Sequence, residues 1–419
     1  MNCATQIAAW RSFFENKFMR TNLLLLLAAF LFSFTSGAQN SQLAQLLEKH
    51  GLKGIANQQF AKVALSKADC ETVYPFLIEA WQNEVYQRLH EDAEQLCLRR
   101  GDLNLRFAGH DFGECPEDGY SLYISLHGGG SAPHQVNDQQ WMNQINLYHP
   151  AEGFYIAPRA PWDDWNMWFK PGFDEFLEDL IQWMVVANEV NPNRVYLMGY
   201  SAGGDGVWRM APRMADRWAA ASMMAGHPGE AQQVNLLNVP FMIWMGENDA
   251  AYNRNVLARE KGLVMDSLAN VEPLNYIHET HIVPGKGHWM EQADTVAVDW
   301  MANFEREPLP SHVVWRQEDV VRSNLYWLEV DKVLARPGMR VDAEITDNTI
   351  QILRCDYDQL RIYLNDEMVN LDQPVSVVYR GRTLYKGKPR RTMANMARTL
   401  AERGDYNWIF PSYVDIKIK

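Results

Sequence analysis

Ser201, Asp249 and His288 are the three residues whose types and order fit nucleophilic catalysis. Ser201 lies in the pentapeptide Gly199-Tyr-Ser-Ala-Gly203, directly after an apolar run of strand type. A serine hydroxyl is inert at neutral pH until a base takes its proton, and a carboxylate must orient that base. Asp249 and His288 follow the serine in a suitable order, and Glu247 is the second choice for the carboxylate. These residues predict hydrolysis of an acyl bond.

A glycine-rich segment upstream supplies the other groups that acyl transfer needs. The apolar run Ser121–Ser125 leads into Leu126-His-Gly-Gly-Gly130. Backbone N–H groups exposed in such a turn can stabilise a developing oxyanion, and the N–H of Ala202 would complete the hole. The alternative is a loop that serves only flexibility. Binding of a phosphate is excluded, because the segment matches neither of the glycine-rich phosphate motifs.

The segments that carry this chemistry stand in a definite order along the chain. They are HGGG from His127, GYSAG from Gly199, GENDA from Gly246 and GKGHW from Gly285. In this order they resemble the α/β-hydrolase superfamily. Within it the chain is most similar to secreted carbohydrate esterases, polyhydroxybutyrate-depolymerase-like enzymes and prolyl-oligopeptidase-like serine hydrolases. The resemblance covers residues 120–304, a little under half of the chain.

The resemblance implies a role for each residue of the site. Ser201 would be the nucleophile, His288 the general base and Asp249 its orienting partner, with an oxyanion hole made by Gly128, Gly129 and Ala202. The expected function is that of a secreted serine hydrolase, which cleaves a small-molecule or polysaccharide-linked carboxylic ester through an acyl-enzyme intermediate. The alternatives are a serine peptidase of the same fold and a glycan-binding or adhesion protein with an inactive hydrolase-like scaffold.

The elements that must hold these residues follow from the hydrophobic pattern. From Tyr120, short apolar runs that end in Gly, Pro or Asp alternate with helical patterns such as Phe173–Val190. Strands that alternate with helices predict a mostly parallel sheet covered on both faces. We therefore expect a doubly wound α/β-hydrolase catalytic domain over residues 119–308.

Both flanks of this domain have a different pattern. Residues 39–118 read as a helical segment, with apolar residues returning every three or four positions and a loop from Phe107 at its end. Residues 311–419 contain short alternating strands at regular spacing, which predicts a small all-β sandwich domain. In this domain the basic run Arg380–Arg391 predicts a solvated hairpin, and contact with a polysaccharide is the alternative.

Aromatic residues near the expected site are candidates for substrate binding. Trp162, Trp165 and Trp168 recur at three-residue spacing, and Trp289 follows the expected base. Flat aromatic faces can stack on sugar rings or on an aromatic acyl group. A small hydrophobic cluster beneath a surface loop is an equally good interpretation. His127 is a further candidate for lining the site, although it precedes the serine.

Residues 1–38 have the pattern of a secretory signal peptide. Arg20 precedes the apolar run Leu23–Phe34, and small residues precede a possible cleavage site before Gln39. Met19 is a possible true start. We therefore expect a secreted or periplasmic protein with no integral membrane span after cleavage, and an uncleaved anchor is the alternative.

Composition bears on partners and on the redox state. A net charge of −13 disfavours a basic face for phosphates, so we expect no nucleic-acid partner. His278 and His281 have no third ligand nearby and no Cys-x-x-Cys occurs, so we expect no metal ion and no cofactor. The oligomeric state does not follow from the sequence. Four cysteines remain after cleavage, and they are Cys70, Cys97, Cys115 and Cys355. We expect one disulfide among the first three of them.

Overall fold

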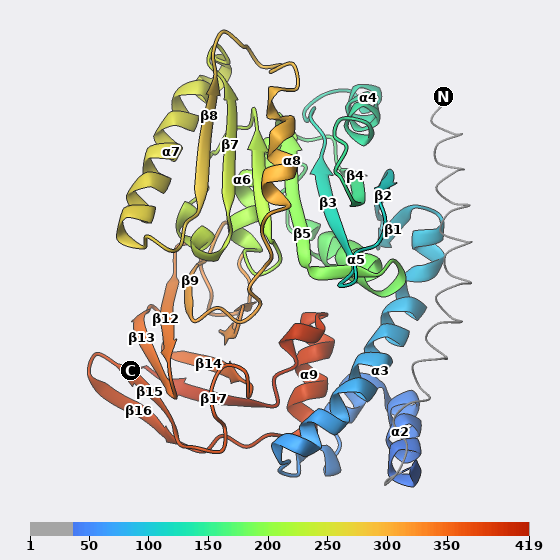
Figure 1. The fold of residues 1–419 in the computed structure, drawn as a ribbon, viewed down its shortest axis with the longest axis vertical. Coiled ribbons are helices and arrows are strands. Elements are labelled where there is room, and N and C mark those ends of the chain that lie inside the picture. Colours follow the sequence, from blue (N-terminus) through green and yellow to red (C-terminus); the bar gives the residue numbers. More distant parts are fainter. Residues whose placement is uncertain (1–36, 419) are drawn as a thin grey trace. The chain divides into compact units, whose positions relative to one another are not determined.

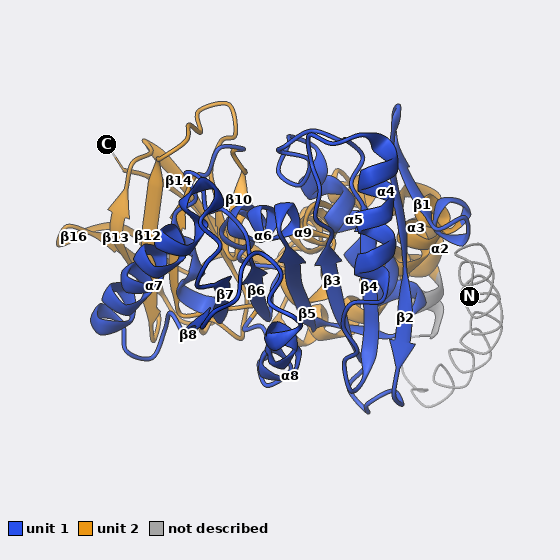
Figure 2. Ribbon diagram, turned by 90° about the horizontal axis from the view of Figure 1, so that it is seen from above, with its two compact units in different colours: residues 1–14, 91–307, 318–320 blue, residues 15–90, 308–317, 321–419 orange. Residues whose placement is uncertain are grey.

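The computed structural model describes residues 37–418, which form parts of two compact units (Figure 2). The expected signal peptide, with Met19 and the apolar run Leu23–Phe34, lies outside the described residues. Unit 1 is built from the middle of the chain, and unit 2 combines the N-terminal helices with the C-terminal region. The described ranges are 91–307 and 318–320 for unit 1, and 37–90, 308–317 and 321–418 for unit 2.

The centre of unit 1 is an eight-stranded sheet with the order β1-β2-β4-β3-β5-β6-β7-β8 (Figure 1). β2 pairs antiparallel with both β1 and β4, and all other neighbours are parallel. The mostly parallel sheet that the sequence predicts is therefore confirmed. The strands are β1 (Cys97–Arg100), β2 (Leu103–Phe112), β3 (Tyr120–Leu126), β4 (Gly153–Arg159), β5 (Val190–Tyr200), β6 (Ala220–Met224), β7 (Phe241–Gly246) and β8 (His278–Val283).

Helices cover both faces of this sheet, with α8 on one side and α6 on the other (Figures 1 and 2). Every residue of β3, β4, β6 and β7 is buried, which explains why these strands read as unbroken apolar runs. The fold is thus the doubly wound α/β arrangement expected of an α/β hydrolase. The helices are α4 (His134–Ile145), α5 (Phe173–Ala187), α6 (Ala202–Arg213), α7 (Arg254–Val271) and α8 (Val296–Met301), with short 3₁₀ turns at Gln233–Asn238, Ala251–Asn253 and Ala293–Thr295.

The helical segment expected over residues 39–118 ends earlier than predicted. Helices α2 (Gly37–Ala56) and α3 (Lys67–Glu94) are followed by the hairpin of β1 and β2, so both the helix to residue 118 and the loop from Phe107 are wrong. The reason is turn chemistry. Gly101, with a φ of 57°, begins a two-residue turn that reverses the chain between the two strands.

Unit 2 contains two sheets, as expected, together with helices from both ends of the chain. The sheet orders are β10-β11-β14-β17 and β16-β15-β13-β12-β9. Helix α2 packs against α9, a helix that the sequence pattern did not indicate. The C-terminal elements are β9 (His312–Arg316), β10 (Asn324–Leu325), β11 (Leu328–Glu329), β12 (Arg340–Thr346), β13 (Thr349–Cys355), β14 (Gln359–Leu364), β15 (Val375–Tyr379), β16 (Arg382–Gly387), α9 (Met393–Arg403) and β17 (Ser412–Lys417), with a 3₁₀ turn at Tyr406–Trp408. A further 3₁₀ turn, Phe60–Lys62, lies between α2 and α3.

Three smaller expectations are answered by the described residues. The basic run Arg380–Arg391 forms the predicted hairpin as far as Gly387, at the end of β16, but Arg391 at the end of the run is buried and is not solvated as expected. The disulfide expected among the first three cysteines is wrong, because Cys70 and Cys97 are free thiols on α3 and β1. Among residues 37–418, none of the helices combines the length and the hydrophobicity that crossing a bilayer requires.

Candidate active site

Ser201 occupies a strained turn between β5 and α6. Its φ and ψ are 58° and −120°, a conformation that costs a non-glycine residue about 1–3 kcal/mol. The neighbouring glycines are required by close backbone contacts. A Cβ atom on Gly203 would lie 1.9 Å from the carbonyl oxygen of Leu126, and one on Gly199 would lie 2.5 Å from that of Gly203. The turn therefore holds the Ser201 hydroxyl at the carboxyl end of a central strand.

His288 and Asp249 complete a chain of hydrogen bonds that begins at Ser201. His288 Nε2 lies 2.8 Å from Ser201 Oγ, and its Nδ1 lies 2.7 Å from Asp249 Oδ2. Since a carboxylate can only accept, Nδ1 carries the proton and Nε2 is free to accept the serine proton. The two residues follow β7 and β8, so the order Ser, Asp, His along the chain becomes one cluster at the carboxyl edge of the sheet.

Asp249, and not Glu247, is the carboxylate that contacts the histidine. The Asp249 side chain is only 2% exposed, which shields its interaction with His288 from water. Glu247 instead accepts a hydrogen bond from the N–H of Gly285, at 2.9 Å. It braces the loop that carries His288 and has no contact with the imidazole among those that the structure records.

Tyr200, which the sequence did not single out, fixes the histidine loop. Its hydroxyl donates to the carbonyl oxygen of His288 at 2.7 Å and accepts from the N–H of Met290 at 3.0 Å. Its ring also packs near those of His288 and Trp289. Because Tyr200 directly precedes Ser201, one strand end positions both the hydroxyl and the base. The only signal in the sequence is an aromatic residue before the serine.

The glycine-rich loop lies against Ser201. A Cβ on Gly128 would lie 3.2 Å from Ser201 Cβ, so this glycine adjoins the serine. Gly129 has a φ of 108°, and a Cβ there would collide with Asn137 Oδ1. The N–H of Gly130 donates to the same Asn137 oxygen at 2.8 Å. Ala202 is the first residue of α6, where the N–H has no partner within the helix.

His127 is a structural residue and not a substrate contact, contrary to expectation. It is fully buried, its Nε2 accepts the N–H of Ala160 at 3.2 Å, and its Nδ1 donates to the carbonyl oxygen of Gly128 at 2.6 Å. Burial lowers the pKa of His127 to about 3, so the ring is neutral. The His127 ring supports the backbone of the glycine-rich loop through its bond to Gly128, and its burial leaves a ligand no access to the ring.

The tryptophans divide into buried and exposed residues. Trp168 is fully buried and donates a hydrogen bond to the carbonyl oxygen of His127, so the expectation that it contacts substrate is wrong. Trp162 is half-buried, with the Lys170 ammonium 5.4 Å from its ring centre. Trp165 and Trp289 are exposed. The Cα of Trp165 would lie 3.4 Å from a Cβ on Gly130, and Trp289 follows the catalytic candidate His288, so both adjoin the site.

Tyr252 is a further exposed aromatic residue that the sequence analysis missed. It lies three residues beyond Asp249, with its ring 5.0 Å from the guanidinium of Arg254. Tyr252 and Asn253 both have φ near 55–58°. Consecutive non-glycine residues in the left-handed region are uncommon and cluster at functional sites. No hydrophobic periodicity marks such a residue, so only its position after the carboxylate could have suggested it.

The expectation that His278 and His281 are ordinary polar positions fits their surroundings. His278 contacts Asp266 at 3.0 Å, and His281 contacts Glu279 at 2.8 Å. Both lie on the edge strand β8. Within residues 37–418 no group of three or more His, Cys, Asp or Glu side chains has the arrangement to hold a metal ion.

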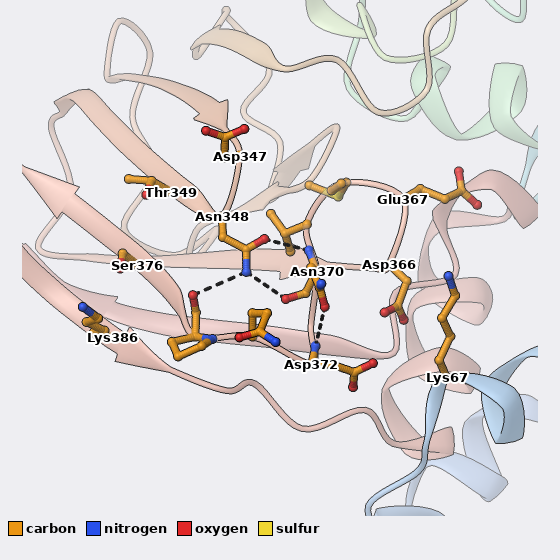
Figure 3. A pocket seen from close by; sticks show the side chains of 14 residues that line it. Lys67, Asp347, Asn348, Thr349, Asp366, Glu367, Asn370, Asp372, Ser376 and Lys386 are labelled. Atoms are coloured by element: carbon orange, nitrogen blue, oxygen red, sulfur yellow. Dashed lines mark hydrogen bonds between the residues drawn. The ribbon is translucent and has the colours of Figure 1, made fainter.

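Unit 2 has a polar cavity of its own, of about 940 Å³, which Figure 3 shows from close by. Asn348 donates to the carbonyl oxygen of Asn370 at 2.8 Å and accepts from its N–H at 2.7 Å. The carboxylates of Asp366 and Asp372 are paired with Arg391. Its lining carries lysines and carboxylates but no histidine.

Comparison with known proteins gives similarities to solved structures alone. No family model matches the chain, and neither does any curated protein. A thermostable esterase is 18% identical with a TM-score of 0.36, over 50% of this chain and 62% of that one. A ferulic acid esterase is 16% identical with a TM-score of 0.36, over 49% of this chain and 96% of that one. A poly(3-hydroxybutyrate) depolymerase from Bordetella parapertussis is 17% identical with a TM-score of 0.36, over 50% and 87%. The fold is shown by the strand order of the eight-stranded sheet and by the helices on both of its faces.

Proposed function

We propose that the protein is a serine hydrolase that cleaves carboxylic ester bonds. The observation that carries this proposal is the pair of hydrogen bonds from Ser201 through His288 to Asp249, built on a strained strand–helix turn. Strain of this kind persists only where the surrounding structure maintains it, and a buried carboxylate behind an imidazole is the arrangement that activates a serine.

The reaction follows from the positions of these groups. The Ser201 oxygen bonds to the acyl carbon while its proton passes to His288 Nε2, and Asp249 stabilises the imidazolium that forms. The oxyanion is stabilised by the N–H groups of Gly128, Gly129 and Ala202, each of which contributes about 3–4 kcal/mol in enzymes of this kind. His288 then protonates the leaving alcohol. Water, activated by the same imidazole, releases the acid.

The exposed aromatic side chains around the triad support a cyclic or aromatic group on the substrate. Trp165, Trp289 and Tyr252 are exposed, and each is near one member of the site in sequence or in space. Aromatic faces stack on sugar rings and on aromatic acids. We therefore propose a polysaccharide-linked or aromatic ester as substrate. Replacing Trp165 and Trp289 by Ala should raise KM for aryl esters and leave KM for methyl esters unchanged.

Hydrolysis of p-nitrophenyl esters and of p-nitroanilides by the wild type and by Ser201→Ala tests the proposed function. Ester hydrolysis that falls to the uncatalysed rate in the variant is the expected result. Faster hydrolysis of the anilides would identify a peptidase instead. If a folded wild-type protein hydrolyses no ester, the proposal fails, and binding of glycans becomes the activity to measure.

We also propose that the protein is exported with cleavage of residues 1–38. The support is the pattern of Arg20, the apolar run Leu23–Phe34 and the small residues before Gln39. Sequencing the N-terminus of the protein recovered from the periplasm or the medium should give Gln39. A mature protein that retains the apolar run would contradict the proposal.

A further inference from the structure

Two arginines, one beside Asp249 and one on α6, have guanidinium groups without hydrogen bonds. Arg254 begins α7, and Arg209 lies on α6; their side chains are only 13% and 11% exposed. Within residues 37–418 neither guanidinium donates a hydrogen bond, and Arg254 Nε is buried without a partner. A charge withdrawn from water is costly unless it is paired and hydrogen-bonded. An acceptor supplied by a ligand would therefore stabilise both guanidinium groups.

The carboxylates near these arginines are engaged elsewhere. Asp249 Oδ1 lies 3.6 Å from Arg254 Nη1, beyond hydrogen-bond distance, while its other oxygen accepts from His288. Asp319 Oδ2 lies 4.0 Å from Arg209 Nη1, and its Oδ1 accepts from Arg213 at 2.6 Å. Each arginine therefore has one carboxylate within ion-pair distance, and neither carboxylate is close enough to accept a hydrogen bond from it.

Arg209 lies against the loop that follows β6. A Cβ on Gly229 would lie 2.6 Å from Arg209 Nη2, and the N–H of Gly229 donates to His227 Nδ1 at 2.9 Å. The N–H of His227 donates in turn to Asp205, on the first turn of α6, at 2.6 Å. Burial raises the pKa of Asp205 to about 6, and the hydrogen bond from His227 and the nearby charges of Arg254 and Arg209 oppose that shift. Both arginines thus lie in the surroundings of Asp205, which His288 shares.

We propose that Arg209 and Arg254 bind a carboxylate carried by the ester substrate, so that the natural substrate is an anion. This inference rests on the proposed ester hydrolysis and specifies its substrate class. A guanidinium presents a planar set of donors that matches the two oxygens of a carboxylate, and such charge-assisted bonds are about twice as strong as neutral ones. The exposed ring of Tyr252, stacked on Arg254, would cover the bound group.

Matched pairs of esters that differ in one charge test the proposal. p-Nitrophenyl hydrogen adipate against p-nitrophenyl hexanoate places the carboxylate on the acyl side, and 4-acetoxybenzoate against phenyl acetate places it on the alcohol side. In at least one pair, the wild type should have a kcat/KM at least about tenfold higher for the anion. Added salt should reduce that preference, because it screens partly exposed charges.

Variants of the arginines locate the preference. Arg254→Gln and Arg209→Gln should each lower the ratio of kcat/KM between anionic and neutral ester by about tenfold or more. Since Arg254 also adjoins Asp249, its replacement can lower kcat/KM for both the anionic and the neutral ester. The ratio of the two values cancels that common effect. Arg259→Gln is the control, because Arg259 is exposed on the same helix and its loss removes the same charge. This variant should keep the wild-type ratio.

The outcomes separate the two proposals. If the wild type hydrolyses neutral esters through Ser201 but prefers the neutral member of both pairs, or shows no preference, the anion site is wrong and the proposed function holds. An unchanged ratio in both Arg254→Gln and Arg209→Gln has the same meaning. If neither member of any pair is hydrolysed, the proposed function fails and the anion site fails with it. Hydrolysis of the neutral esters by each variant confirms that it is folded.

Discussion

Replacing Tyr200 by Phe removes one hydroxyl that ties the histidine loop to the nucleophile strand. The variant keeps the ring, which packs near His288 and Trp289, and loses the bonds to the carbonyl oxygen of His288 and to the N–H of Met290. Met290 is fully buried, so its N–H would have no acceptor in the variant. The variant therefore keeps Ser201, His288 and Asp249 and changes only the support that positions His288.

The expected cost follows from these two bonds. A hydrogen bond contributes about 1 kcal/mol to stability, and a buried donor left without a partner costs about 1–3 kcal/mol. The free energy of unfolding of Tyr200→Phe should therefore fall by about 2–3 kcal/mol. A base displaced by a fraction of an ångström should lower kcat about tenfold, since a displacement of about 1 Å costs on the order of a hundredfold. KM for p-nitrophenyl acetate should change little, because the hydroxyl faces the loop backbone.

Urea unfolding and steady-state kinetics measure both effects. The matched control is Tyr276→Phe, because Tyr276 is buried in the same unit and its hydroxyl donates to the carbonyl oxygen of Val234, in the 3₁₀ turn Gln233–Asn238, at 2.8 Å. Tyr276→Phe should lose stability and keep the wild-type kcat. An unchanged kcat in Tyr200→Phe, or an equal loss of kcat in both variants, would refute a positioning role for Tyr200.

Three further changes test other parts of the site. Asp249→Asn should lower kcat for esters by about 10⁴-fold in steady-state assays, because an amide favours the wrong tautomer of His288; an effect under tenfold would contradict the role of Asp249. Gly203→Ala should lower the free energy of unfolding by more than about 3 kcal/mol, because its Cβ would lie 1.9 Å from the oxygen of Leu126; wild-type stability in urea would show that the turn relaxes. Burial raises the pKa of Asp205 from 3.8 to about 6, so the folded protein binds this proton more tightly than the unfolded chain does. The free energy of unfolding therefore falls as the pH rises from about 4 to about 6 and Asp205 loses its proton. Asp205→Asn should thus be about 3 kcal/mol more stable than the wild type at pH 8 and equal to it below about pH 4, as measured by urea unfolding at each pH.

The clustering of Ser201, Asp249 and His288 could be predicted because each residue is marked by its local sequence. Ser201 stands between glycines after a strand, and Asp249 and His288 each follow a strand end, so parallel strands bring them to one edge of the sheet. Of the two carboxylates that follow β7, Asp249 is the one that contacts His288. Contacts that fix the site, such as those of Tyr200, depend on which side chains meet across loops, and no local pattern encodes them.

The errors at His127 and Trp168 have one cause. Both stand next to functional loops in the sequence, but both point beneath them, where Trp168 donates to the carbonyl oxygen of His127. A histidine is buried there only because each ring nitrogen has a backbone partner. Burial of this kind depends on satisfied hydrogen bonds, which composition and spacing do not reveal.

The grouping of α2 with the C-terminal elements has a consequence for synthesis on the ribosome. The apolar side chains of Leu52, Ile55 and Leu77 are buried in a unit whose last strand, β17, ends at Lys417. Unit 1 is nearly continuous in the chain and can fold as soon as it emerges, whereas α2 must wait for α9. A prematurely terminated chain would present exposed apolar helices to chaperones and proteases, so quality control can distinguish full-length protein from truncated protein at its N-terminal end.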